Sequence, residues 1–131
     1  MRRAFTLLLG SLLLSASPAQ AASNPQAGEA KLARALEGRV AGEPVDCVNL
    51  SQIRSSRIIN GEAILYETAG GTVYVNRPEG RESLNDWDLL VTKPFMNRLC
   101  SIDTVEIYDS GARMWKGVVF LNEFVPYRKA R

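Results

Sequence analysis

The 131-residue chain contains no histidine, and this absence excludes several kinds of catalytic site. Ser-His-Asp and Cys-His catalysis both need an imidazole that accepts a proton near neutral pH. Nearly every zinc site is excluded as well, because the two cysteines cannot complete a set of nitrogen and sulfur ligands. A phosphate-binding loop and the common serine-nucleophile motifs are also missing. We therefore predict no cofactor and no metal ion, and we expect a non-enzymatic protein.

A long apolar run occurs only at the N-terminus. Two arginines precede an apolar run over residues 4–14, and Ala19 and Ala21 fit the small-residue rule for signal-peptide cleavage. The run is shorter than the ~20 apolar residues that a membrane span needs. We therefore predict a signal peptide over residues 1–21, export to the periplasm or beyond the cell, and no stable membrane anchor after cleavage.

The chain also lacks a net charge once this segment is removed. Of 16 basic residues, two are the arginines of the predicted signal peptide, so 16 − 2 = 14 remain against 14 acidic residues. Nucleic-acid-binding domains neutralise phosphates with clustered basic residues. We therefore do not expect nucleic acid as a partner, and we interpret the basic residues at 128–131 as a solvated tail.

The apolar pattern that is present predicts a mainly β fold after one helix. Leu32, Leu36 and Val40 recur at helical spacing, which predicts a helix over residues 26–40. From residue 55 on, short apolar runs alternate with turn signals, which predicts about six short strands in an antiparallel meander that closes into a small barrel or a strongly twisted sheet. The last strand would run over residues 114–124 and end before Pro126.

These elements divide the chain into four parts. The signal peptide at 1–21 is followed by the helix and a linker at 22–45, a β domain at 46–127 and the basic tail at 128–131.

Two turn signals set the predicted register of the first strands. If Asn60-Gly61 is a two-residue turn and residues 69–71 form a three-residue loop, one face is apolar and would be core. Its residues are Ile58, Ala63, Leu65, Val73 and Val75. The other face carries Arg57, Tyr66, Tyr74 and Asn76. A two-residue turn at Gly70-Gly71 would instead place Tyr66 in the core.

The mixed face is our candidate binding surface, with Arg54 at its edge. Tyrosine and arginine dominate the energetics of many interfaces, and an arginine, two tyrosines and an amide suit an envelope protein, a peptide or a glycan. Tyrosines that simply cover the barrel are the alternative.

Cys47 and Cys100 are the only cysteines. In an exported domain such a pair usually forms a disulfide, here closing a loop of about 54 residues worth roughly 4 kcal/mol. A reactive thiolate is the alternative, although it would need a neighbouring group that lowers its pKa.

Asp86, Asp88 and Asp103 are the carboxylates most open to a chemical interpretation. Two carboxylates can act as acid and base in glycoside hydrolysis, but aspartate is also common in turns and at strand ends. We therefore favour a non-enzymatic binding or interaction module. The alternatives are a carboxylate-based hydrolase and a structural envelope protein without a small ligand.

Several short motifs together resemble a known family. They are a Cys followed by Ile-Arg-Ser-x-Arg, a Gly-x-x-Tyr-x-Asn hairpin, Leu-Cys-x-x-Asp and Phe-x-Pro. The matching residues are Cys47, Ile53, Arg54, Ser55, Arg57, Gly71, Tyr74, Asn76, Leu99, Cys100, Asp103, Phe124 and Pro126. This pattern resembles a family of small exported proteins of Gram-negative bacteria that is defined only as a domain of unknown function.

The resemblance implies a fold and a compartment, but no catalytic residue. Many members carry a second cysteine pair, and its nearest positions here are Arg81 and Val119. Neither position is a cysteine in this sequence, as expected if one disulfide had been lost as a pair. The resemblance therefore implies that the remaining cysteines, Cys47 and Cys100, form a disulfide.

Overall fold

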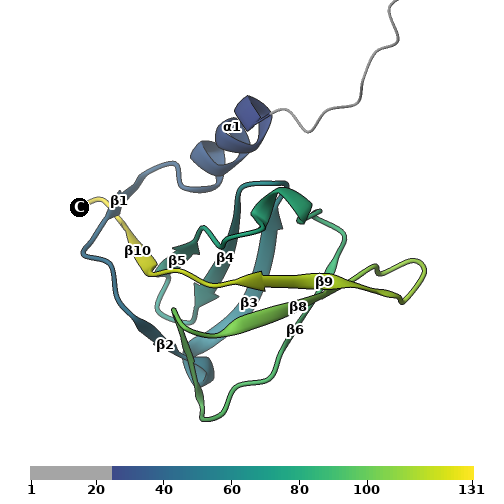
Figure 1. Ribbon diagram of the computed structural model, residues 1–131. Helices are drawn as coiled ribbons and strands as arrows, with labels where there is room; N and C mark the ends of the chain where they lie inside the picture. Colours follow the sequence, from purple (N-terminus) through teal and green to yellow (C-terminus); the bar gives the residue numbers. More distant parts are fainter. Residues whose placement is uncertain (1–24) are drawn as a thin grey trace, which may run out of the picture.

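A computed structural model gives the structure of the protein, and the residues that it describes are 25–131 (Figure 1). The predicted signal peptide at residues 1–21 lies outside them. Within residues 25–131, one α-helix, α1 (Pro25–Ala35), precedes ten strands. The strands are β1 (Arg39–Ala41), β2 (Cys47–Asn49), β3 (Ile53–Ile59), β4 (Ala63–Thr68), β5 (Val73–Asn76), β6 (Leu89–Thr92), β7 (Arg98–Cys100), β8 (Thr104–Tyr108), β9 (Trp115–Phe120) and β10 (Phe124–Lys129).

The strands form three antiparallel sheets. A five-stranded sheet has the order β1-β10-β5-β4-β3, a two-stranded sheet pairs β2 with β7, and a three-stranded sheet has the order β6-β8-β9. The predicted class, mainly β with an N-terminal helix, is confirmed. The strands outnumber the prediction because three-residue strands such as β1 and β2 are too short for a visible alternation.

The C-terminal strand departs from the prediction. Pro126 lies inside β10 rather than after the last strand, and β10 inserts between β1 and β5. The missing N–H of Pro126 is tolerated because it lies opposite Gly42, beyond the end of β1, where the Gly42 N–H donates to the Pro126 carbonyl over 2.7 Å. Arg128 and Lys129 also pair with β1, so half of the predicted tail at 128–131 is part of the sheet.

The helix is shorter than predicted. It ends at Ala35, and Gly38 then adopts a left-handed conformation with φ of 74°, which reverses the chain into β1. Val40 consequently lies in β1 and is 60% exposed, so only Leu32 and Leu36 serve the predicted apolar face. Sheet pairing with β10 has overridden the helical spacing at Val40.

The five-stranded sheet is buried on both faces. Helix α1 covers one face, where the buried residues are Leu32, Ile59, Ala63, Leu65, Val73 and Val75. The other two sheets cover the opposite face, and the larger core there comprises Val48, Ile58, Ile64, Tyr66, Leu84, Leu99, Val105, Ile107, Val119, Leu121 and Phe124. Core residues therefore line both faces of this sheet, and β3 keeps an exposed stretch around Arg57 on the helix side.

The register of β3 against β4 differs from the prediction by one residue. Ile59 pairs with Ala63 rather than Glu62, because residues 60–62 form a three-residue loop. The Gly61 N–H donates to the Leu84 carbonyl over 3.0 Å, a long-range contact that holds this longer loop. A slip of one residue exchanges the faces of a strand. Arg57 therefore lies on the helix-covered face, and Ile58 lies on the face of the larger core.

The predicted three-residue loop at 69–71 is confirmed. Tyr66 pairs with Tyr74, and the Thr68 N–H donates to the Thr72 carbonyl over 3.0 Å. The side chains of β4 and β5 are therefore sorted between the two faces as predicted.

The two cysteines lie opposite each other in the β2–β7 pair. The Cys47 and Cys100 sulfurs are 2.09 Å apart, which is a disulfide bond. The predicted pairing is confirmed, and the reactive-thiolate alternative is wrong for this state of the protein.

Candidate binding surfaces

Both tyrosines of the predicted binding surface pack against the larger core. Tyr66 is only 4% exposed and packs edge-on against Phe124, with 5.8 Å between the ring centroids. Burial raises the pKa of its hydroxyl, which has no hydrogen-bond partner among residues 25–131. Tyr74 is half-buried against the same core.

Asn76 has a structural role as a clamp. It is 0% exposed; its Nδ2 donates to the Asn122 carbonyl over 2.6 Å, and its Oδ1 accepts from the Asn122 N–H over 3.1 Å. These bonds fix the turn between β9 and β10 and satisfy an amide that would be costly to bury alone. Asn76 is therefore unavailable to a ligand.

The two arginines of the predicted surface lie elsewhere. Arg57 is on the opposite face of the sheet from both tyrosines, and its Nη2 is 3.5 Å from Glu67. Arg54 is exposed at the irregularity in β3 where the register shifts between Ile53 and Ser55. The predicted binding surface is thus wrong. The one-residue slip of β3 moves Arg57 to the other face of the sheet, and Tyr66 and Asn76 are buried.

The three singled-out carboxylates have separate structural partners. Asp86 pairs with Lys31 over 3.1 Å, and the buried Asp88 pairs with Lys116 over 2.6 Å. Asp103 accepts from the Cys100 N–H over 2.7 Å in the turn after β7. None of these contacts joins two carboxylates into an acid–base pair. Within the described residues, no cluster of three or more His, Cys, Asp or Glu is placed to hold a metal ion.

A different surface stands out on the three-stranded sheet. The inner face of β6, β8 and β9 is buried, whereas the register places large apolar side chains in two rows across the outer face. The rows are Leu89–Tyr108–Trp115 and Val91–Glu106–Val118, and Phe120 extends the face opposite Thr104. We call this surface the outer sheet face.

Apolar residues on the outer sheet face are strongly exposed. Leu89 is 51% exposed, Trp115 60%, Val118 39% and Phe120 54%. With full areas of about 150–250 Å² for large side chains, these four present roughly 400 Å² of apolar surface. The largest exposed apolar patch of a monomeric protein is typically about 300–600 Å² and is often functional.

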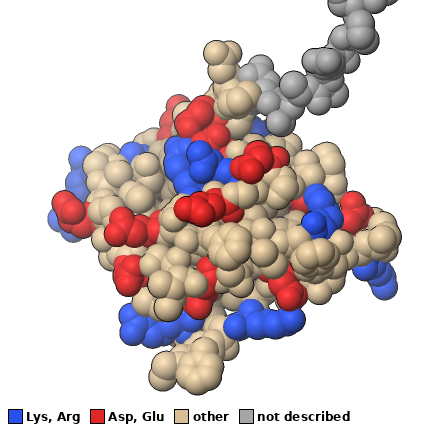
Figure 2. All heavy atoms as spheres, in the orientation of Figure 1, with Lys and Arg blue, Asp and Glu red and all other residues tan. Residues whose placement is uncertain are grey.

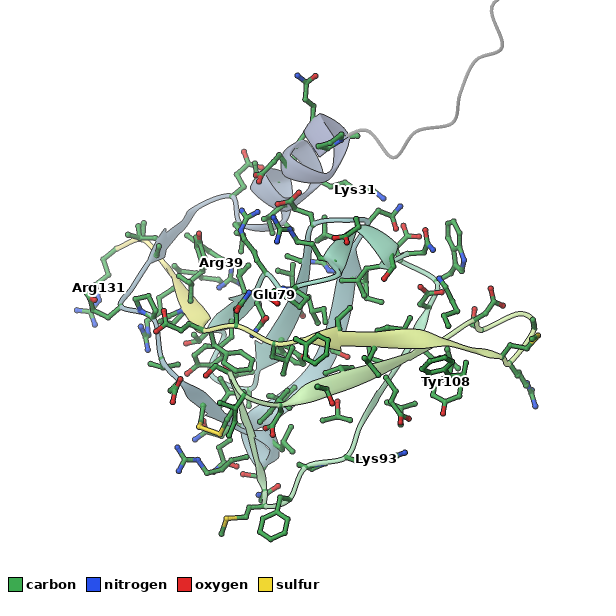
Figure 3. The ribbon with its side chains drawn as sticks, viewed as in Figure 1. Lys31, Arg39, Glu79, Lys93, Tyr108 and Arg131 are labelled. Carbon is green, nitrogen blue, oxygen red and sulfur yellow. A yellow bond between two sulfur atoms is a disulfide. The ribbon has the colours of Figure 1, made fainter. Side chains whose placement is uncertain are left out.

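One acidic residue lies at the centre of this face. The Glu106 carboxylate accepts from the Tyr108 hydroxyl over 3.2 Å and pairs with Lys93 over 3.1 Å. Figure 2 shows much of the surface over β9 uncharged and bordered by charges of both signs. Figure 3 shows Tyr108 near the end of β8, Lys93 on the segment after β6, and the disulfide as a yellow bond beside β2. The outer sheet face thus combines exposed apolar side chains with a bonded polar pair, Glu106 and Tyr108.

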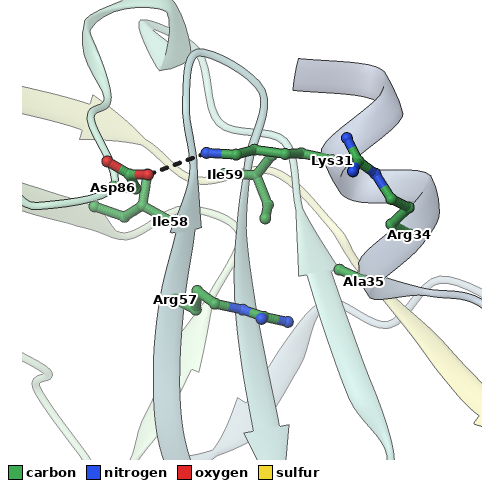
Figure 4. Close-up of a pocket in the computed structure, with 7 residues that line it drawn as sticks. All are labelled: Lys31, Arg34, Ala35, Arg57, Ile58, Ile59 and Asp86. Atoms are coloured by element: carbon green, nitrogen blue, oxygen red, sulfur yellow. Dashed lines mark hydrogen bonds and ion pairs between the residues drawn. The ribbon is translucent and has the colours of Figure 1, made fainter. Parts of the chain in front are cut away.

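A second surface is a groove between α1 and β3 (Figure 4). It has a volume of about 530 Å³ and is lined by Lys31, Arg34, Ala35, Arg57, Ile58, Ile59 and Asp86. Asp86 lies at one end and is bonded to Lys31, whereas Arg34 has no acidic partner among residues 25–131. Three basic residues against one acidic residue give the groove a formal charge of 3 − 1 = +2. We call this surface the basic groove.

An ion-pair network fixes the wall of the basic groove that α1 provides. Arg77 bonds Glu29 of the helix over 2.8 Å and also bonds Glu62 of the loop before β4. The hydrogen bond from Arg77 lowers the pKa of Glu29, whereas burial raises the pKa of Glu62. Gly28 allows close approach, since a Cβ there would lie 2.9 Å from the Asn60 carbonyl oxygen. The helix is therefore held against the sheet at a defined position.

Comparison with protein-family models, with curated proteins and with solved structures found no match. The resemblance to the exported family thus stays a prediction. The two positions at which many members of that family carry a second cysteine pair are Arg81 and Val119 here. The structure places their segments side by side, because Glu79 forms a β-bridge with Phe120. Within residues 25–131, no helix has the length and apolar character to cross a membrane.

Proposed function

We propose that the protein is a non-enzymatic binding module of the periplasm or of the secreted fraction, and that its partner contacts the outer sheet face. The observation that carries this proposal is the exposure of Trp115 and Phe120 on one side of a sheet whose other side is core. Tryptophan and other rigid aromatic residues contribute disproportionately to protein interfaces.

The electrostatics of this face support a protein partner. Glu106 lies among apolar neighbours, and Lys93, which pairs with it, keeps a side chain that is 73% exposed. A protein partner could bury the surrounding apolar side chains and donate a hydrogen bond to Glu106. Protein interfaces commonly combine an apolar core with a few direct hydrogen bonds of this kind. The missing histidine, which removes the commonest general base, agrees with a binding role.

The proposal is tested by photo-crosslinking in living cells. A photoreactive amino acid replaces Val118 in the centre of the outer sheet face, and crosslinked partners are identified by mass spectrometry. We expect a discrete adduct that disappears when Trp115→Asp is added. The matched control places the same amino acid at Phe95, which is 99% exposed on a different loop. An adduct that forms equally at both positions, or that persists with Trp115→Asp, would contradict the proposal.

A further inference from the structure

The edge of the five-stranded sheet next to the basic groove is open. β3 is the last strand in the sheet order and pairs only with β4 among the described strands. An unpaired edge offers a row of backbone N–H and C=O groups to another extended chain. Strand addition to such an edge is a common way in which domains bind peptides.

The register identifies the backbone groups that point outward. The Ile59 carbonyl accepts from the Glu62 N–H over 2.9 Å, so the backbone of Ile59 points toward β4. Because this direction alternates along a strand, Arg57 points the same way, and the backbone groups of Ser56 and Ile58 point away from the sheet. Ser56, which is exposed, thus provides one donor and one acceptor for an added strand, whereas Ile58 is only 4% exposed and lies at the buried end of β3.

The basic groove lies along this edge and determines what an added strand would carry. An added strand lies about 4.8 Å from its neighbour and directs alternate side chains to each face of the sheet. On the helix side those side chains would enter the basic groove, where Arg34 and Lys31 stand on one wall and Arg57 on the other. Arg57 has only a weak ion pair to Glu67, with both side chains more than 40% exposed. An incoming carboxylate that pairs with Arg57 would therefore replace only a weak, exposed ion pair with Glu67.

We propose that the basic groove binds an extended acidic peptide segment of another protein, which adds to β3 as a further strand and directs alternate carboxylates toward Arg34 and Arg57. The charge of the groove favours carboxylates, and the open backbone edge favours an extended chain. This site is separate from the outer sheet face, so either proposal can fail without the other.

The test uses a fluorescein-labelled eight-residue peptide of alternating glutamate and threonine, with fluorescence anisotropy on the purified protein. Neutralising Arg34 and Arg57 together to glutamine should weaken binding at least about tenfold, the effect expected for losing one or two charge-assisted hydrogen bonds. Arg98→Gln with Arg113→Gln makes the same charge change on exposed residues outside the groove. This control should bind within about twofold of the unsubstituted protein.

A second pair of peptides separates strand addition from charge attraction alone. N-methylation of alternate backbone amides removes donors that an added strand needs, and should weaken binding about tenfold through lost hydrogen bonds. A peptide of alternating lysine and threonine should not bind. The proposal is overturned if both charge-neutralised proteins bind alike, if the N-methylated peptide binds as well as its parent, or if the lysine peptide binds. Equal urea midpoints for all protein variants establish that each is folded.

Discussion

Removing the disulfide should cost the protein a large share of its stability. We consider Cys47→Ser with Cys100→Ser, which removes the bond without leaving a free thiol. The cysteines are 53 residues apart in sequence, and closing a loop of that size stabilises the folded state by about 4 kcal/mol in the chain-entropy model. Domains of this size are typically stable by only about 5–15 kcal/mol.

The structure explains why the surroundings would not compensate for this loss. β2 and β7 have three residues each and pair only with each other. Val48 and Leu99, the central residues of that pair, are 4% and 0% exposed and belong to the larger core. Loss of the bond therefore loosens two core side chains together with the strands that carry them.

Urea denaturation followed by tryptophan fluorescence measures the effect. With a slope of about 2 kcal/mol per molar urea, the expected loss moves the midpoint down by about 2 M. Wild-type protein reduced with dithiothreitol should match the double variant, and the reductant should leave that variant unchanged. A midpoint shift below about 0.5 M, a quarter of the expected shift, would refute the reasoning, as would free thiols in the denatured, unreduced wild type.

Three further substitutions test the core and its buried carboxylate in the same assay. Phe124→Ala should lower the free energy of unfolding by about 3–5 kcal/mol, because Phe124 is fully buried, and a loss under about 1 kcal/mol contradicts its core position. Tyr66→Phe should leave stability unchanged or raise it by about 1 kcal/mol, because the buried hydroxyl has no partner among residues 25–131; a clear loss would reveal one. Burial raises the pKa of Glu62 above 4.5, so the folded state holds its proton more tightly than the unfolded state. Wild type should therefore lose stability relative to Glu62→Gln as pH rises from about 4.5 through the raised pKa, and a constant difference between pH 4 and 7 would contradict this sign.

Local signals predicted part of this fold well. The cysteine pair in a small domain with a predicted export signal, and the three-residue loop before β5, each follow from chemistry within a few residues or from composition. Both are confirmed. The slip of β3 was not predictable in this way, because the loop over residues 60–62 also bonds to a residue remote in sequence, through the Gly61 N–H and the Leu84 carbonyl.

The candidate sites were harder to predict than the fold. Asn76 looked like a surface amide, yet its partner Asn122 lies 46 residues away. The outer sheet face could not be predicted from alternation, because β9 has three consecutive apolar residues. They are Val118, Val119 and Phe120, of which only Val119 is buried. Alternation in sequence reports two faces of a strand but not which of them other elements cover.

The position of β10 determines when the five-stranded sheet can form during folding. An internal strand of the largest sheet, β10, is built from Phe124–Lys129, and it lies between β1 and β5, which both come earlier in the sequence. Until those residues are available, β1 has no partner and β5 has an open edge. A chain that emerges N-terminus first from a ribosome therefore cannot complete this sheet before residues 124–129 are free. Contacts between residues far apart in sequence, such as the pairing of β1 with β10, also slow folding.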